Sequence, residues 1–421
     1  MNERLLQFIW QHQYYNHTSL EFTNGCPFQI IHQGIFNSHQ GPDFTEARIA
    51  FDNQLWIGNI ELHVRSSDWK KHDHQHDANY NNVICHVVWI DDETNPANSV
   101  PVFLLGERIP KLLLSQYETW MHGDHAFVPC INRITEVDVT VHSEWQLQLI
   151  EQRLNEKTEA IKKELMHWKF HWEQTCWILM AKNFGIRVNT ELFEAVARSL
   201  PLNLIGRHKQ QIHSLEALLL GQAGLLESEF EEQYPRLLQK EYRFLRKKYN
   251  LRQVFIPVHF LRMRPLNFPT VRLAQLAMFL HTSAGFFSII RDGDQLSIVR
   301  KKLAVTANDY WHYHYRPDQL SSFLPKQVGA DMIDNLVINT ISPLLYAFGK
   351  IQNQACYIEK AFRWLTLTGA EKNSHTKGFY RAGLKAANAL ESQALLELKT
   401  NFCDERKCLE CGIGKTLLAK T

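Results

Sequence analysis

Two acidic residues in the N-terminal part of the chain, Asp43 and Glu61, have the types and spacing needed to share a divalent cation. Asp43 stands at the start of one expected strand and Glu61 near the end of the next, so antiparallel pairing would bring both to one end of a sheet. Two carboxylates held close together repel each other unless a cation lies between them. Mg²⁺ or Mn²⁺ would suit such a pair, because carboxylates and water are their usual ligands. The alternative is that both are ordinary surface acids.

Several histidines follow the acidic strands and offer further metal ligands. His72 and His76 are four residues apart, so on a helix they would share one face and could bind zinc. They could instead offer protonatable groups to a phosphate, or simply be solvated. His86 lies in an apolar strand and is expected to be a satisfied sheet residue. The auxiliary candidates for the acidic site in this stretch are His72, His74 and Asp77.

Three cysteines near the C-terminus, Cys403, Cys408 and Cys411, have the spacing C-x4-C-x2-C. Thiolates so close in sequence are typical of a zinc site or an iron–sulfur cluster, which requires a fourth ligand. The sequence does not identify that ligand, and Cys356 and His375 are guesses. The alternative is three thiols packed against apolar neighbours.

One segment is strongly basic although the chain as a whole carries a formal charge of only +2. From Arg236 to Arg272 there are ten Lys or Arg residues and one acid, Glu241, which gives a local balance of +9. Aromatic residues are interleaved with these cations, a combination that suits phosphate neutralisation and base stacking. A solvated helix face is the alternative. The candidate nucleic-acid contacts are Lys240, Arg243, Lys247, Arg262 and Arg264.

The elements that would position these residues indicate an α+β protein. Hydrophobic residues make up 45% and charged residues 21% of the 421 residues, as in globular proteins. Residues 1–115 are expected to form a mixed sheet flanked by helices, and 143–421 a large all-helical domain with a Cys-rich tail, because apolar residues recur there at helical period. Residues 116–142 would connect the two. The elements expected in the first part are a helix over 3–15, strands over 28–36, 47–52 and 55–64, a helix through 72–80, and strands over 83–90 and 101–106.

The chain shows no sign of export or membrane insertion. The N-terminal residues lack a basic flank followed by a long apolar run, so we expect no signal peptide. No apolar run reaches the roughly 18 residues of a membrane span. Eight cysteines in 421 residues are more typical of thiols or metal ligands in a reducing compartment than of a disulfide framework. We therefore expect a cytoplasmic protein with nucleic acid as a partner and no membrane.

Pro42-Asp43, seventeen intervening residues and then Glu61-Leu62-His63 resemble the PD-(D/E)XK nuclease superfamily. Its core order of helix, three strands, helix and strand is also the order expected here. The resemblance implies that Asp43 and Glu61 hold the metal, that the Leu62 carbonyl adds a ligand and that Glu3 on the first helix assists. His63 stands where the superfamily has lysine, and as a catalytic residue it would orient the attacking water or take its proton. Some nucleases of this superfamily carry iron–sulfur clusters.

Two further resemblances rest on longer motifs. The run from His72 to Asp77 partly resembles the H-x-H-x-D-H motif of metallo-β-lactamase-like hydrolases, with its last His and Asp in reverse order. Nearly the whole chain resembles the DUF2851 proteins, a bacterial family for which no activity is implied. The stretches that match are GPDFTEARI, GNIELHVRSSDWKKHDHQHDANYNNVICHVVW, MRPLNFPTVRLAQLA and CDERKCLECGIG.

Taken together, the motifs predict a metal-dependent nuclease that hydrolyses phosphodiester bonds. The replacement of lysine by His63 leaves an alternative from another class, a catalytically inactive protein of nuclease fold that acts as a binding or interaction module.

Overall fold

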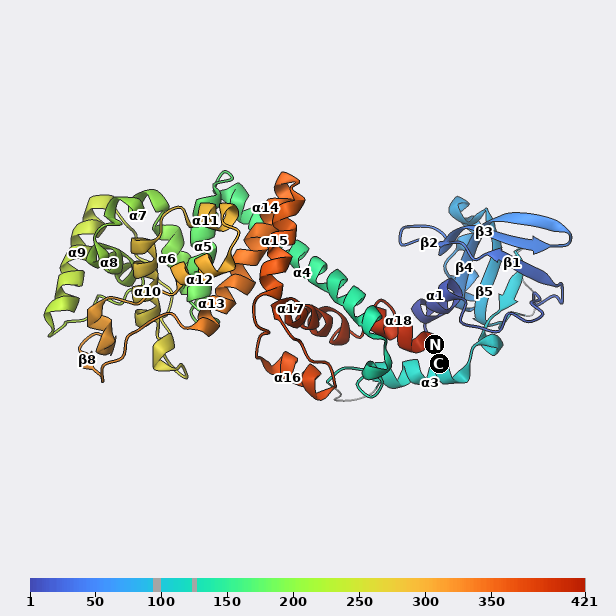
Figure 1. The fold of residues 1–421 in the computed structure, drawn as a ribbon. Coiled ribbons are helices and arrows are strands. Elements are labelled where there is room, and N and C mark those ends of the chain that lie inside the picture. The colour runs from blue at the N-terminus through green and yellow to red at the C-terminus, as the bar shows by residue number, and fades with distance from the viewer. Residues whose placement is uncertain (94–99, 123–126, 421) are drawn as a thin grey trace. The chain divides into compact units, whose positions relative to one another are not determined.

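The computed structural model describes residues 1–93, 100–122 and 127–420, which form two compact units (Figure 1). Unit 1 consists of Met1–Trp145, Gly378–Leu384 and Leu398–Thr421, and unit 2 of Gln146–Lys377 and Lys385–Glu397. The residues expected to connect two domains, 116–142, therefore lie in unit 1, and Gly123 among them lies outside the described residues. The Cys-rich tail also belongs to unit 1 and not to the helical part with which its sequence position grouped it.

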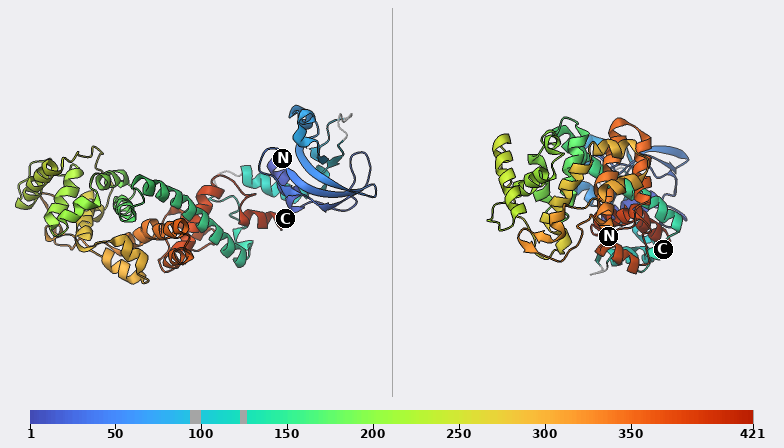
Figure 2. Two further views of the ribbon diagram at one scale, coloured as in Figure 1. Left: turned by 90° about the horizontal axis from the view of Figure 1, so that it is seen from above. Right: turned by 60° about the vertical axis from the view of Figure 1, so that its left-hand side comes forward.

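Unit 1 is built on a mixed, curled sheet, whose strands are the blue arrows in Figures 1 and 2. The strand order is β1-β3-β4-β5-β6, and β2 also pairs with β3. Pairing is antiparallel on the β1–β3–β4 side and parallel on the β4–β5–β6 side. The strands are β1 (Phe28–His32), β2 (Ile35–Phe36), β3 (Phe44–Phe51), β4 (Gln54–Arg65), β5 (Val83–Ile90) and β6 (Val102–Leu104).

The β3–β4 hairpin follows from its turn residues. Asp52 and Asn53 both have positive φ, 50° and 55°, as a tight two-residue turn between right-twisted strands requires. This turn places Phe51 opposite Gln54 and sets the register of the whole pair. A register shift between Phe44 and Ala47, where Glu46 has φ 60°, bends β3 near its first residue.

Helix α1 (Glu3–His12) begins at Asn2, whose side chain accepts a hydrogen bond from the Leu5 N–H at 2.9 Å. Its apolar residues, among them Leu6 and Ile9, are buried, and the helix contacts β4. Strand β5 is buried along most of its length, as expected of a strand with parallel neighbours on both sides.

The segment between β4 and β5 differs from the expected helix. It contains the one-turn helix α2 (Asp68–Lys71) and two short 3-10 turns, η1 (His74–His76) and η2 (Ala78–Tyr80). Asp73, with φ 59°, takes a left-handed conformation that a continuing helix cannot accommodate. The prediction that His72 and His76 share a helix face is therefore wrong.

Unit 2 is helical apart from the short pair β7 (His314–Arg316) and β8 (Gln319–Leu320). The chain thus has an α+β fold, with its six-stranded sheet in unit 1. Helices α4 (Val139–His167) and α16 (Ser374–Arg381) begin in one unit and end in the other. The further helices of unit 1 are α3 (Lys111–His122) and α18 (Gly412–Ala419). Those of unit 2 are α5 (Trp172–Phe184), α6 (Thr190–Ser199), α7 (Leu202–His208), α8 (Ile212–Gln222), α9 (Gln233–Tyr249), α10 (Pro269–Thr282), α11 (Phe286–Asp292), α12 (Leu296–Leu303), α13 (Ala330–Leu336), α14 (Ser342–Gln352), α15 (Ala355–Thr366) and α17 (Ala389–Glu397). Within the described ranges, no single helix is long and apolar enough to cross a membrane. Helices α10 and α11 reach the required length and apolar character only when they are counted together, and they are bent by 68° relative to each other.

Candidate functional site

The structure brings the two predicted acids together. Asp43 directly precedes β3 and Glu61 lies on the neighbouring, antiparallel β4. The Asp43 main-chain N–H donates to Glu61 Oε2 at 3.0 Å, and the Leu62 N–H donates to Asp43 Oδ2 at 3.1 Å. Gln7 on α1 adds a third hydrogen bond, from Nε2 to Asp43 Oδ1 at 2.8 Å. Each carboxylate is thus fixed by groups from adjoining strands or from α1.

Burial and mutual repulsion make this carboxylate pair costly to ionise. The pKa of Glu61 is raised to about 9, chiefly by burial and then by the Asp43 carboxylate, with a smaller contribution from Glu3. The pKa of Asp43 is raised to about 6 by burial, although its hydrogen bonds from Gln7 and Leu62 act in the opposite direction. Glu3 raises this pKa too. Carboxylates gathered in this way favour a positively charged guest.

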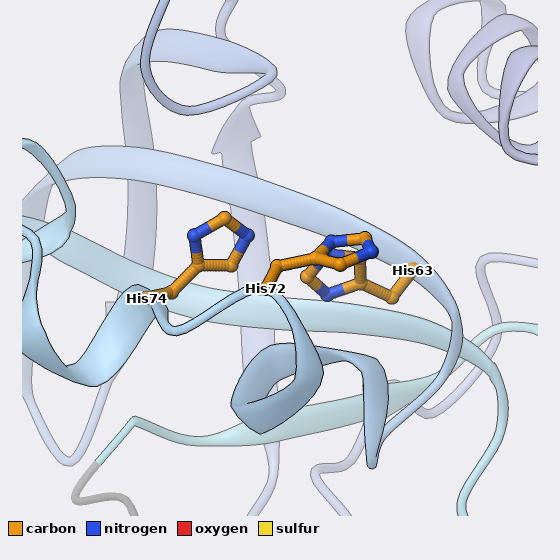
Figure 3. A group of neighbouring side chains, drawn as sticks. All are labelled: His63, His72 and His74. Carbon is orange, nitrogen blue, oxygen red and sulfur yellow. The ribbon is translucent and has the colours of Figure 1, made fainter.

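Imidazoles surround the outer oxygen of Glu61. His63 Nε2 lies 3.6 Å and His74 Nε2 3.5 Å from Glu61 Oε1. His63 on β4, together with His72 and His74 from the segment after α2, presents ligand nitrogens that all lie within 4.8 Å of one another (Figure 3). The buried Nε2 of His74 makes no hydrogen bond. We call Asp43, Glu61, His63, His72 and His74 the acid–histidine site.

Burial holds His63, at the centre of this site, in its neutral form. His63 Nδ1 lies 2.9 Å from His86 Nε2, and His63 Nε2 lies 3.1 Å from His72 Nδ1. The pKa of His63 is lowered to about 2 by burial and by the neighbouring imidazoles, and burial lowers the pKa of His86 to about 4. A neutral imidazole keeps one nitrogen lone pair free for a metal ion. If His63 donates its Nδ1–H to His86, the free lone pair is on Nε2, which faces His72 and Glu61.

Three residues at the site were not predicted from the sequence. Gln7 holds Asp43, as described above. Tyr80 stacks on His74 with ring centroids 3.8 Å apart, and burial together with Glu61 raises its pKa to about 12. The Trp69 ring meets the His74 ring edge-on, with ring centroids 5.4 Å apart. It meets the His86 ring at a tilt, with ring centroids 5.0 Å apart. Neutral polar and aromatic residues of this kind give no sequence signal, because they act by positioning others.

Two other residues of the His-rich stretch lie away from the ligand atoms. His76 is exposed and its Nδ1 lies 2.5 Å from the Asp73 carboxylate. Asp77 accepts a hydrogen bond from the Asn79 N–H at 2.9 Å, which caps η2. Its charge raises the pKa of His74, against the larger lowering caused by burial, so Asp77 influences the site without being one of its ligands.

The basic segment divides into exposed and buried parts. Lys240, Arg243 and Lys247 are exposed along one side of α9, and we call them the basic face of α9. A groove beside this face is lined by Arg243, Lys247 and the 89% exposed Phe255, among other residues. Arg262 and Arg264 in the following loop are exposed as well.

Arg272 does not belong to that surface, although its sequence position groups it with the basic segment. It is 7% exposed on α10 and donates to Gln275 and Asn267, at 2.9 and 2.6 Å. Burial lowers its pKa to about 10. The aromatic residues divide similarly, since Tyr242 is buried whereas Phe244 is 59% exposed.

Unit 1 is therefore an α+β structure in which carboxylates and imidazoles converge beside the hairpin of a mixed sheet, a donor set that could hold a divalent metal ion. The chain belongs to the family described as "Protein of unknown function (DUF2851)", which matches residues 3–374. This match agrees with the family resemblance of the sequence motifs, although the C-terminal cysteines lie beyond the matched residues. No curated protein and no solved structure matches the chain.

Proposed function

We propose that this chain is a metal-dependent nuclease that hydrolyses phosphodiester bonds of nucleic acid at the acid–histidine site. The observation that carries the proposal is the pair of half-buried Asp43 and buried Glu61, joined through the Asp43 N–H and bordered by the imidazoles of His63 and His74. Such a pair gains most from a divalent cation, because the cation stabilises both carboxylates in their charged form against burial and mutual repulsion. Mg²⁺ or Mn²⁺ is the proposed cofactor, and the nitrogen donors of the histidines favour Mn²⁺.

The main chain at Leu62 supports the same assignment. The N–H and C=O of a strand residue point toward the same neighbouring strand. Since the Leu62 N–H reaches Asp43 Oδ2, its carbonyl also points to the side of the acids. Asp43, Glu61 and this carbonyl would then supply the oxygen ligands. A bound divalent ion would stabilise charge on the scissile phosphate and lower the pKa of a bound water.

The order of elements in unit 1 supports the resemblance to the PD-(D/E)XK superfamily. Helix α1 precedes β1, β3 and β4, and α2 then leads into β5. Asp43 and Glu61 occupy the positions that the superfamily motif assigns to its two acids. The exposed cations of α9 would bind the phosphate backbone of the substrate, with Phe244 and Phe255 available for base stacking.

His63 is the residue on which catalysis depends most. A lysine at this position would bring a positive charge, whereas the lowered pKa of His63 leaves it neutral. Its Nε2 can orient the attacking water or join the ligands of the ion. This neutrality also favours the second candidate function, a nuclease-fold protein that binds nucleic acid without cleaving it.

The test is cleavage of single- and double-stranded DNA and RNA by the purified chain with Mg²⁺ or Mn²⁺. Asp43→Asn and Glu61→Gln should each lower the rate about 100-fold or more while nucleic-acid affinity stays near that of the parent, because each removes a metal ligand without changing side-chain shape. Asp52→Asn and Glu46→Gln are matched controls, since both acids are exposed on the same hairpin. Equal cleavage by the site variants and the parent would refute the active-site assignment. Binding without cleavage by the parent would favour the second candidate.

His63 variants separate its two proposed roles. If His63 is a metal ligand, His63→Ala should lower Mn²⁺ affinity and cleavage together. If it orients water, the variant should bind Mn²⁺ as the parent does and lose only cleavage.

A further inference from the structure

Four possible metal-ligand atoms gather on the outer side of Glu61. Its Oε1 lies 3.6 Å from His63 Nε2 and 3.5 Å from His74 Nε2. His63 Nε2 in turn lies 3.1 Å from His72 Nδ1. The ligand nitrogens of the three histidines all lie within 4.8 Å of one another (Figure 3). One oxygen and three nitrogens, from β4 and the segment after α2, thus form a compact set.

The spacing of these atoms suits a tetrahedral zinc ion. With zinc–ligand bonds of about 2.0–2.1 Å, neighbouring ligand atoms lie about 3.3–3.4 Å apart. The distances of 3.1, 3.5 and 3.6 Å within the set lie close to this value on either side. Imidazole nitrogens and carboxylate oxygens are also ligands that zinc commonly takes.

The two oxygens of Glu61 have different neighbours. Oε2 accepts the hydrogen bond from the Asp43 N–H at 3.0 Å and therefore faces the other acid. Oε1 faces His63 and His74. A carboxylate can bind two metal ions, one through each oxygen, as in sites whose two ions lie about 3.5–4 Å apart. Glu61 is placed to bridge an ion with oxygen ligands and an ion with nitrogen ligands.

Neighbouring residues orient the buried imidazoles as ligands. His63 Nδ1 lies 2.9 Å from Nε2 of the buried His86, and a proton on Nδ1 leaves His63 Nε2 free to bind a metal. The His74 ring stacks on Tyr80, and its side chain is only 10% exposed. Among the described residues, the buried His74 Nε2 has no hydrogen-bond partner. Such a nitrogen is costly to bury, and a metal ion would satisfy it.

The third histidine leaves the set open to solvent. His72 is exposed, whereas His63 is only 1% exposed. An ion from solvent therefore meets His72 first and the buried nitrogens after it. Because His72 is exposed, its ring can also adjust to an ion that is held by the other two imidazoles.

The cysteines of the C-terminal tail do not offer a comparable set. Cys408 and Cys411 are buried and Cys403 is half-buried. Within the ranges that the structure describes, three ligand atoms within 4.8 Å of one another are found at the three histidines and not at these cysteines. The compact ligand set of unit 1 is therefore one of imidazoles and not of thiolates.

We propose that the imidazoles of His63, His72 and His74 bind a zinc ion. Glu61 Oε1 is its fourth ligand, and Oε2 remains on the side of the Mg²⁺ or Mn²⁺ ion of the proposed function. In chelator-treated protein Mn²⁺ can enter the same set of ligands, with lower affinity than zinc.

The zinc ion explains the histidine in the motif. His63 stands where the PD-(D/E)XK motif has lysine, and a zinc ion on its Nε2 brings positive charge to the position that the lysine ammonium would supply. This role of the ion rests on the proposed nuclease function, whereas its binding does not.

The test measures zinc in the full chain by elemental analysis, after treatment with a chelator, reloading with zinc and gel filtration. The parent should hold one zinc ion per chain more than His72→Ala or His74→Ala, and excess Mg²⁺ should not remove it, because Mg²⁺ prefers oxygen ligands. His72 is exposed, so its replacement leaves the packing of the core intact. His76→Ala, at an exposed histidine of the same segment, should keep the zinc. Equal zinc content in the parent and both ligand variants would overturn the proposal.

Asp43→Asn distinguishes two ions from one. With two ions, this variant should keep its zinc and lose affinity for Mn²⁺ in the zinc-loaded protein, because Asp43 is not a ligand of the zinc. If a single ion were shared by the whole acid–histidine site, Asp43→Asn would lose zinc as well and Mn²⁺ would displace zinc one for one. Either of these results would overturn the proposal.

Cleavage assays separate this inference from the proposed function. Zinc-free parent should cleave nucleic acid with Mg²⁺ about 100-fold or more slowly than zinc-loaded parent, because it lacks a fixed positive charge at the reacting phosphate. His63→Lys should cleave equally with and without zinc. Equal rates for the zinc-loaded and zinc-free parent would refute the role of the ion in cleavage. Zinc binding without any cleavage by the parent would refute the nuclease function and support the zinc site alone.

Discussion

The acid–histidine site of unit 1 and the basic face of α9 in unit 2 both concentrate charge, but under opposite conditions of solvation. Glu61 and His63 are buried, and burial is the largest cause of their altered pKa values. Lys240, Arg243 and Lys247 are exposed to water, which screens their charges at little cost. A buried acid pair specifies its guest closely, because only a cation of the right size and ligand preference relieves it. An exposed basic face specifies only the sign of its partner.

The largest effect should come from the histidine ligands. Replacing His72 and His74 together with Ala should lower Mn²⁺ affinity about 100-fold or more, measured by isothermal titration calorimetry, since loss of even one supporting group costs about 10- to 100-fold. His76→Ala is the control, because His76 is exposed on the same segment. Nucleic-acid affinity without metal should not change. Unaltered Mn²⁺ affinity in the double variant would remove these imidazoles from the site.

A smaller effect is expected from the basic face of α9. Changing Lys240, Arg243 and Lys247 to Glu should weaken nucleic-acid binding about 10-fold or more at moderate salt. Each lost phosphate contact should also reduce the slope of log affinity against log salt by about 0.7–0.9. Fluorescence anisotropy across a salt titration measures both.

Mn²⁺ affinity of the α9 variant should equal that of the parent, because the change lies in the other unit. A matched control reverses three exposed lysines elsewhere in unit 2, Lys162, Lys163 and Lys302. If that control weakens binding as much as the α9 variant does, the effect is one of total charge and not of the basic face.

The smallest effect concerns stability and pH. Glu61 has an ordinary pKa of 4.5 and a folded-state pKa of about 9, so between these values the folded, metal-free protein binds more protons than the unfolded chain. Its stability should therefore fall as pH rises through this window. Glu61→Gln removes the titrating group and should show a flatter decline, with a melting temperature a few degrees above that of the parent near pH 9 in the presence of a chelator.

Mn²⁺ should reverse the difference between Glu61→Gln and the parent, since it stabilises only the protein that binds it. Differential scanning fluorimetry from pH 5 to pH 9, with and without Mn²⁺, provides both comparisons. Identical pH profiles for the two proteins would indicate that the pKa of Glu61 is not raised in the folded, metal-free protein.

The sequence allowed much of the local structure and part of the site to be predicted. The turn at Asp52 and Asn53 and the apolar run of β5 depend on neighbouring residues, and the structure has both. The meeting of Asp43 with Glu61 followed from the antiparallel pairing of the two strands. The contributions of Gln7 and Tyr80 could not be predicted, because nothing in a local pattern shows which neutral side chain packs against a distant strand.

Two errors of interpretation have a common physical cause. The spacing of the histidine run favours a helix, but a single left-handed residue, Asp73, prevents the helix from continuing. Arg272 follows the exposed cations in sequence and is therefore expected among them, yet it lies in the first turn of the buried helix α10. Tertiary contacts decide each of these cases, and single-sequence patterns do not encode them.

The composition of unit 1 from three separate stretches of the chain has a consequence for its biosynthesis. Its sheet leaves the ribosome first, then nearly all of unit 2, and only afterwards its C-terminal stretch, which begins at Leu398. At 5–20 residues per second, roughly 15–60 s separate the synthesis of Cys130 from that of Cys411. During that interval unit 1 lacks its last helix, α18. Unit 1 therefore completes its folding only after unit 2 has been synthesised. A chain that ended before the tail would lack α18, and its unit 1 would stay incompletely folded.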